Sequence, residues 1–196
     1  MAKRILMACL LVGLSGAANA TLIDRGSGMI YDDVLDITWL SDANLGGSMN
    51  WDDSVAWADT LIFGGFDDWR LASMDVNMDN MIVDCFSVSE AACQDNELGY
   101  MFYQNMVTFA DPGLLFTNVQ FEHWSGTEFA PNPFGAWGFS FGNGGQFVDG
   151  KGFNLGAWAV RSGDVLAAPE PGMIVLLGLG LAGLGFARRR GRSGLR

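Results

Sequence analysis

The chain has 196 residues, of which 49% are hydrophobic and 12% aromatic, and its net charge is −11. All 22 acidic residues lie between Asp24 and Glu170 with only four basic residues among them, so this segment carries −18. Such a segment argues against binding to nucleic acid or anionic lipid, because both require clustered basic side chains. The aromatic content argues against disorder, and the segment has the usual size of one domain.

The first twenty residues have the pattern of a secretory signal peptide. Basic residues at 3–4 precede an apolar run over 5–14, and Ala18 and Ala20 form a small-residue cleavage site before Thr21. The run is too short to cross a bilayer core of about 30 Å, which argues against a retained anchor. We therefore predict that signal peptidase removes residues 1–20, so that Thr21 begins the mature chain.

The first third of the mature chain is predicted to form a hairpin followed by a helix. The segments 22–32 and 35–40 resemble two short strands joined by an acidic turn. Asn50 is a suitable N-cap, and apolar residues then recur at helical spacing until Gly64 and Gly65 end the pattern. These apolar residues are Trp51, Val55, Ala58, Leu61 and Ile62.

The middle of the chain combines helical patterns with a pair of cysteines. A weak helical pattern covers 80–83 and a longer one covers 96–107. After signal removal only Cys85 and Cys93 remain, and in an exported protein this spacing favours a disulfide that closes a small loop. A metal site would need further ligands, and His123 is the only histidine.

From residue 121 onward the pattern becomes the alternation that is typical of β-strands. Glycine-rich segments at 142–145 and 149–152 are strong turn signals, so an antiparallel sheet is expected. Tryptophans in such segments are expected in or near the core, the alternative being that they are platforms for sugar rings. They are Trp69, Trp124, Trp137 and Trp158.

Two of the scarce basic residues, Arg70 and Arg161, are close to a tryptophan in the sequence. We expect both to form structural ion pairs with internal carboxylates such as Asp68 or Asp164, which would hold the sheet to the helices. Direct contact of these arginines with a ligand is the alternative.

A partial calcium-binding pattern begins at Asp75. With Asn77 and Asp79 it places oxygen-bearing side chains at the first, third and fifth positions of an EF-hand loop. The sixth and twelfth positions hold Asn80 and Phe86 where glycine and glutamate are required. No cofactor is therefore expected, with low-affinity Ca²⁺ binding by this segment as the alternative.

The sequence offers little support for catalysis. A hydrolytic triad would have to use His123, and no nucleophile-elbow sequence exposes a serine for it. We expect His123 to be a polar residue at the surface or at the end of a strand, and we predict no enzymatic activity.

The C-terminal region combines a proline motif, an apolar run over 172–187 and a basic cluster. As a helix the run would be about 24 Å long, which is marginal for a core of about 30 Å and suits a temporary stop in the membrane. Basic residues stay on the cytoplasmic side, so 188–196 is predicted to be a cytoplasmic tail and 166–171 the linker to an external domain. The motif is Pro169, Glu170 and Pro171, and the cluster is Arg188, Arg189 and Arg190.

This arrangement resembles the PEP-CTERM sorting segment of Gram-negative bacteria. The resemblance implies processing by an exosortase, a transient stay in the inner membrane as a transmembrane helix, and delivery to the cell surface or extracellular matrix. Many species with such segments make exopolysaccharide, which makes that polymer a candidate partner.

The segment 21–165 resembles the DUF1566 or Lcl C-terminal family, which is related to C-type-lectin-like folds. Five short motifs in the expected order carry the resemblance: 68–71, 96–103, 123–128, 136–139 and 157–165. The resemblance implies an α+β domain with an antiparallel sheet and two or three helices.

Together these features predict an exported, non-enzymatic protein that associates with exopolysaccharide or another surface polymer, as in a biofilm. One alternative is a structural matrix protein without a specific glycan ligand. A second is an enzyme that acts on extracellular polymer, for which His123 and Glu128 would be the residues to test.

Overall fold

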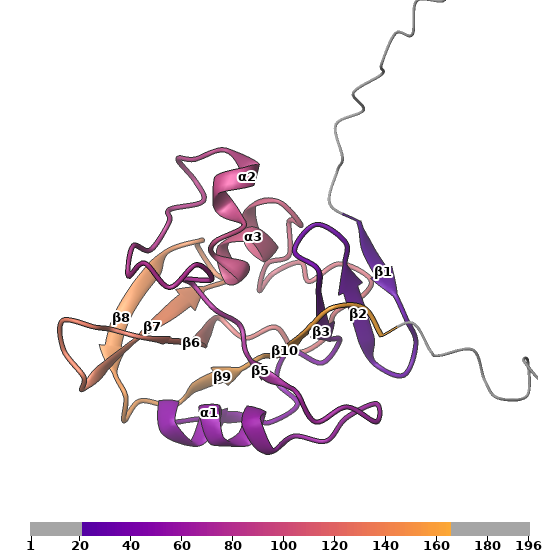
Figure 1. The fold of residues 1–196 in the computed structure, drawn as a ribbon, viewed down its shortest axis with the longest axis horizontal. Coiled ribbons are helices and arrows are strands. Elements are labelled where there is room, and N and C mark those ends of the chain that lie inside the picture. The colour runs from indigo at the N-terminus through magenta and orange to yellow at the C-terminus, as the bar shows by residue number, and fades with distance from the viewer. Residues whose placement is uncertain (1–20, 166–196) are drawn as a thin grey trace, which may run out of the picture.

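A computed structural model describes residues 21–165 as two five-stranded sheets and three short helices (Figure 1). The predicted α+β fold class is confirmed. The predicted signal peptide, the linker with its proline motif, the apolar run 172–187 and the basic tail lie outside the described residues. Within the described part of the chain, no helix has the length and hydropathy needed to cross a membrane.

The first sheet is antiparallel and has the strand order β1-β2-β3-β10-β5. Its strands are β1 (Leu22–Asp24), β2 (Met29–Asp32), β3 (Ile37–Leu40), β5 (Arg70–Leu71) and β10 (Ala159–Ser162). The strand predicted over 22–32 is split in two, because Gly26, Ser27 and Gly28 all adopt positive φ and turn the chain back. The predicted hairpin is therefore a three-stranded meander.

The second sheet has the order β4-β9-β6-β7-β8. Its strands are β4 (Ser48–Met49), β6 (Glu122–Glu128), β7 (Gly135–Ser140), β8 (Gln146–Gly150) and β9 (Leu155–Ala157). Strands β6, β7 and β8 pair antiparallel as expected, but β9 pairs with β6 in parallel. The predicted antiparallel sheet is present in β6, β7 and β8, and the parallel pairing of β9 is added to it because 151–154 carries the chain from the edge strand β8 to the far side of β6.

The three helices are α1 (Trp51–Thr60), α2 (Glu90–Cys93) and α3 (Glu97–Tyr103). The predicted N-cap of α1 is confirmed, since the Asn50 side chain accepts a hydrogen bond from the Asp53 N–H. Helix α1 ends before Leu61, and Ile62 is exposed instead of continuing an apolar helix face.

The two other helix predictions need correction. No helix covers 80–83, because the Asp75 carboxylate accepts the N–H groups of Asp79 and Asn80 and holds this segment as a loop. The helix expected over 96–107 is shorter and ends at Tyr103.

The two sheets meet at Trp158, the single residue between β9 and β10. It is fully buried, and its indole N–H donates to the Leu40 carbonyl at 2.8 Å. Besides the His123 imidazole, three aromatic rings pack with their centroids 4.9 to 5.5 Å from it. Trp69 and Trp124 are buried too, as predicted for the core, whereas Trp137 is only partly buried. The three neighbouring rings belong to Trp39, Phe116 and Phe141.

His123 lies near the start of β6 but is fully buried, so the expected surface position is wrong. Its Nε2 accepts the Gln120 N–H at 2.9 Å, which leaves the proton on Nδ1, and Nδ1 has no partner among the described residues. The rings of Phe141 and Trp158 pack against the imidazole. Burial lowers the pKa of His123 from 6.5 to about 3, because the imidazolium would lose its hydration.

The predicted disulfide between Cys85 and Cys93 is present. It connects the loop after residue 80 to the end of α2, and both cysteines pack against the buried Tyr100 of α3. The bond therefore fixes an otherwise irregular segment to the helical side of the domain.

We predict that His123 makes the protein less stable as the pH falls from about 6.5 towards about 3. In this window the unfolded chain binds a proton that the folded chain does not, so the free energy of unfolding decreases by up to about 1.4 kcal/mol per pH unit. Urea unfolding followed by tryptophan fluorescence measures this slope. His123→Gln lacks the titrating group and should show a flatter curve; parallel curves for the two proteins would contradict the assignment.

We predict that reduction of the Cys85–Cys93 bond lowers the free energy of unfolding by about 2.5 kcal/mol, because the unfolded chain regains the entropy of a short closed loop. Urea unfolding with and without reductant gives the difference. The double variant Cys85→Ser/Cys93→Ser is the control and should match the reduced protein, with no response to reductant.

Candidate functional site

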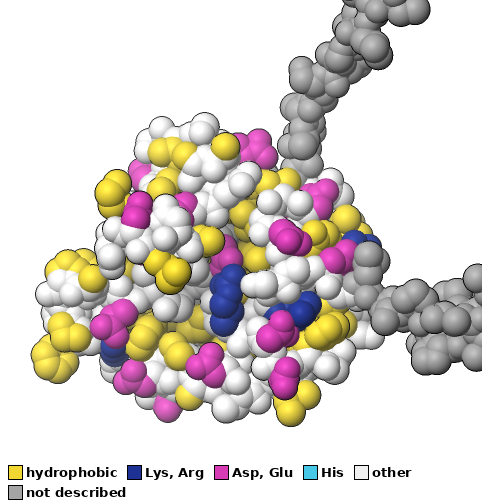
Figure 2. Space-filling model, in the orientation of Figure 1, with side chains coloured by type: hydrophobic (Ala, Val, Ile, Leu, Met, Phe, Trp, Pro, Cys, Tyr) yellow, Lys and Arg dark blue, Asp and Glu magenta, His cyan; other side chains and the backbone are white. Residues whose placement is uncertain are grey.

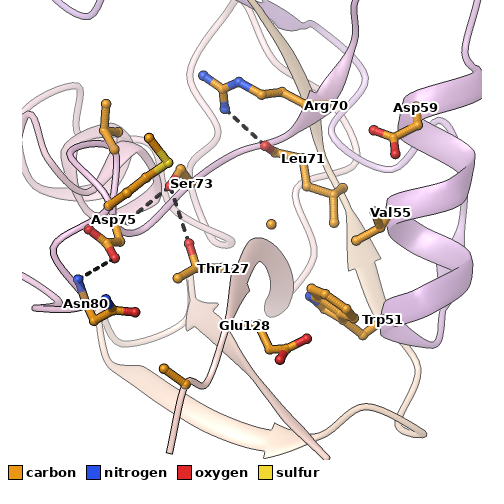
Figure 3. A pocket seen from close by; sticks show the side chains of 14 residues that line it. Trp51, Val55, Asp59, Arg70, Leu71, Ser73, Asp75, Asn80, Thr127 and Glu128 are labelled. Atoms are coloured by element: carbon orange, nitrogen blue, oxygen red, sulfur yellow. Dashed lines mark hydrogen bonds between the residues drawn. The ribbon is translucent and has the colours of Figure 1, made fainter. Parts of the chain in front are cut away.

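A cleft of about 650 Å³ lies between helix α1, strand β5, the segment 73–80 and the end of β6 (Figure 3). The position of the cleft floor depends on Trp158, where the two sheets meet. The Ala72 N–H donates to the Trp158 carbonyl at 3.4 Å, and the Ala72 carbonyl accepts the Gly126 N–H at 2.8 Å. The segment after β5 is thereby bonded to both the sheet crossing and β6.

One wall of the cleft is a face of α1. Trp51, Val55 and Asp59 are spaced four residues apart and project from one side of the helix (Figure 3). The Trp51 indole N–H donates to the Ser125 carbonyl at 2.8 Å and so anchors the ring. Trp51 and Val55 are only partly buried, and the residue of the predicted apolar face that reaches the core is Ala58.

Arg70 reaches the cleft from β5 and forms an ion pair with Glu97, the first residue of α3. Two hydrogen bonds of 2.8 and 2.6 Å join the guanidinium and the carboxylate, and the Ser73 N–H donates to the same carboxylate at 2.6 Å. Burial disfavours the charge of Arg70, but the bonds to Glu97 keep its pKa raised. The predicted ion pair is present, with Glu97 as partner in place of Asp68 or Asp164.

Arg161 of β10 forms its ion pair with Asp68, which the sequence analysis named as a partner. Two hydrogen bonds of 2.7 and 2.8 Å join them, and these bonds lower the pKa of Asp68. Asp164, the other carboxylate named, pairs with Arg25 instead. The Arg161–Asp68 ion pair holds the chain in place just before β5, the strand that lines the cleft.

The partial calcium pattern is reorganised by the fold. The carboxylates of Asp75 and Asp79 lie with that of Asp95, and the three offer oxygens within 4.8 Å of one another. Asn77 lies beside this group, since its side chain is hydrogen-bonded to Asp79 and its N–H donates to the Asp95 carboxylate. Ca²⁺ ordinarily takes about six to eight oxygen ligands. Three carboxylates that each contribute one oxygen supply only half of the smaller number.

Trp51 and Glu128 of the cleft lining form a compact triad with Lys151. The Lys151 ammonium lies 4.1 Å from the centroid of the Trp51 ring and 2.5 Å from a Glu128 carboxylate oxygen. The Trp51 N–H donates to the Lys151 carbonyl at 2.9 Å, which fixes the turn after β8 to the start of α1. An ammonium group is thus held between an aromatic face and a carboxylate.

The other predicted site residues belong to processing. Thr21 is the first described residue, and Cys85 and Cys93 form the disulfide away from the cleft lining. The remaining ones lie outside the described residues: Ala18, Ala20, Pro169, Glu170, Pro171, Arg188, Arg189 and Arg190.

Several residues of the site escaped the sequence analysis. The spacing of Asp59 from Trp51 and Val55 could have revealed it, because all three share one helix face. No local pattern relates Lys151 to Trp51 or Glu97 to Arg70, since these pairs are formed by elements that are distant in the chain.

Comparisons with known families place the cleft inside a recognised domain. A family model of the Lcl C-terminal domain matches residues 28–161, which include every residue that lines the cleft. A model of the PEP-CTERM protein-sorting motif matches residues 167–190. A search of curated proteins found no match.

We predict that the Glu97 carboxylate depends on its arginine more than the Asp68 carboxylate does. The Glu97 side chain is 3% exposed, so Arg70→Met leaves a buried charge without its partner and should cost about 3 kcal/mol of unfolding free energy. The Asp68 side chain is 52% exposed, so loss of its ion pair in Arg161→Met leaves a carboxylate that water can solvate, and this loss should cost less than about 1 kcal/mol. Urea unfolding of both variants tests this order, and equal losses would contradict it.

Proposed function

The chain belongs to the Lcl C-terminal domain family, and we propose that it is a non-enzymatic binding protein for a surface polysaccharide. Its PEP-CTERM motif indicates exosortase-dependent export across the inner membrane to the cell envelope or surface of a Gram-negative bacterium. Export brings the cleft to the compartment in which surface polysaccharide is found.

The observation that carries this proposal is the mixture of side chains in the cleft. A sugar ring has hydroxyl groups at its edge and C–H groups on its faces, so its site needs polar groups beside apolar or aromatic surface. The hydroxyls of Ser73 and Thr127 and the carboxylate of Asp59 lie in the same cleft as Val55 and Trp51 (Figure 3). The volume also falls within the usual range for ligand sites, about 300 to 1,000 Å³.

Binding without catalysis is supported by the state of the groups that could transfer protons. His123 is buried in the core with a lowered pKa, which suits neither proton transfer to a polymer nor contact with it. Glu128 is engaged by Lys151, and both oxygens of Asp75 accept backbone N–H groups. A glycosidase would need two carboxyl groups placed on either side of the scissile bond, one of them protonated.

We predict that filling the cleft abolishes retention on polysaccharide. Val55→Trp adds a large side chain to the lined face of α1 and should reduce retention of the exported protein on the host's own exopolysaccharide at least tenfold. Co-sedimentation with the isolated polymer measures retention, and release of reducing ends measured in parallel tests for turnover.

Ala56→Trp is the matched control, because it adds the same side chain to an exposed position of α1 that does not line the cleft. It should bind as the wild type does. Equal retention of both variants would place the site elsewhere, no retention of the wild type would favour a structural matrix role, and release of reducing ends by the wild type would favour an enzyme.

A further inference from the structure

The charges around the cleft identify the chemical class of the polymer. Arg70 lines the cleft and Lys151 contacts the lining residues Trp51 and Glu128, and each of these two cations is already neutralised, by Glu97 and by Glu128. Asp59, which is exposed on α1, and Asp75, on the opposite wall, have no basic partner among the described residues. The cleft is therefore left with net negative charge on two facing walls.

The rest of the described domain offers an anionic polymer no better surface. Residues 21–165 contain 21 acidic and four basic side chains, and all four basic ones are in ion pairs with carboxylates. Figure 2 shows the result on one face, where magenta acidic side chains outnumber the dark blue basic ones. A uronate or sulfated chain would meet repulsion here, because like charges raise the free energy of association.

The triad of Trp51, Lys151 and Glu128 shows how two residues of the cleft lining hold a primary ammonium group of the chain itself. The Lys151 ammonium contacts a ring face and a carboxylate, and its side chain is only 16% exposed. Lys151 comes from the turn after β8 and contacts two residues of the cleft lining, Trp51 and Glu128, whereas Asp59 and Asp75 of the lining have no such cation.

We propose that the cleft binds a polysaccharide that bears free primary amines, that is, one with de-N-acetylated amino-sugar units. This rests on the proposed function and specifies its ligand. The protonated amines of the polymer lie against the exposed Asp59, and Asp75, whose oxygens accept backbone N–H groups, adds its negative charge from the opposite wall, with the hydroxyls of Ser73 and Thr127 contacting the ring edges. N-acetylation removes the charge and with it the attraction to these carboxylates.

The test uses the full exported protein and two series of oligosaccharides with one backbone. Oligomers of β-1,4-linked glucosamine, at a pH at which the amine is protonated, are compared by calorimetric titration with their fully N-acetylated counterparts. We expect at least tenfold tighter binding of the free amine and a smaller difference at high salt, since salt screens exposed charges. Asp59→Asn should remove most of this preference, whereas Asp52→Asn, exposed on α1 outside the cleft lining, should keep it.

A further variant, Lys151→Met, removes the internal ammonium and leaves Trp51 and Glu128 to the ligand. It should tighten binding of the amine oligomers several-fold without a matching gain for the acetylated ones, an effect that mere loss of structure would not produce.

Equal or tighter binding of the acetylated series would overturn this inference while the proposed function stands. Failure of both series and of the host polysaccharide to bind would overturn the proposed function itself. Oligolysine that binds as tightly, with the same dependence on Asp59, would overturn the sugar assignment in favour of a basic peptide.

Discussion

The burial of Trp158 between two sheets is the constraint on which the rest of the structure depends. Its neighbours on either side in the chain pair with different sheets, so one residue sets how the sheets meet. Its indole N–H needs a partner inside the core and finds the Leu40 carbonyl. Its own carbonyl accepts the Ala72 N–H, which starts the segment that forms the cleft floor. The core junction and the candidate site are therefore parts of one arrangement.

A shortage of cations is the second constraint, and it links stability to binding. Each of the four basic residues in the described part of the chain joins elements that are separate in sequence: Arg25 to Asp164, Arg70 to Glu97, Lys151 to Glu128 and Arg161 to Asp68. Because these cations are used inside the domain, the surface and the cleft keep their negative charge. The ion pairs that hold the fold together thus also set the charge of the candidate site.

Local patterns predicted elements well where the local chain decides the structure. Asn50 caps α1 because its side chain reaches an N–H three residues away, and the Cys85–Cys93 bond closes a loop within one segment. The local pattern misled where a side-chain contact decides: the segment 80–83 is a loop and not a helix, because the Asp75 carboxylate accepts the N–H groups of Asp79 and Asn80. The parallel pairing of β9 was not predicted, because it depends on the chain crossing the sheet after β8.

The sequence by itself determined the route and the class of the protein: its motifs identified the sorting segment and the family, and its alternation and helical spacing indicated an α+β domain. The sorting segment, the family motifs and the periodic patterns each consist of residues that are contiguous in the sequence. Only the tertiary structure decided the site, because a cleft needs side chains from several elements at once. The pairing of Lys151 with Trp51 and of Arg70 with Glu97, and the approach of Asp95 to Asp75 and Asp79, all depend on how distant elements pack.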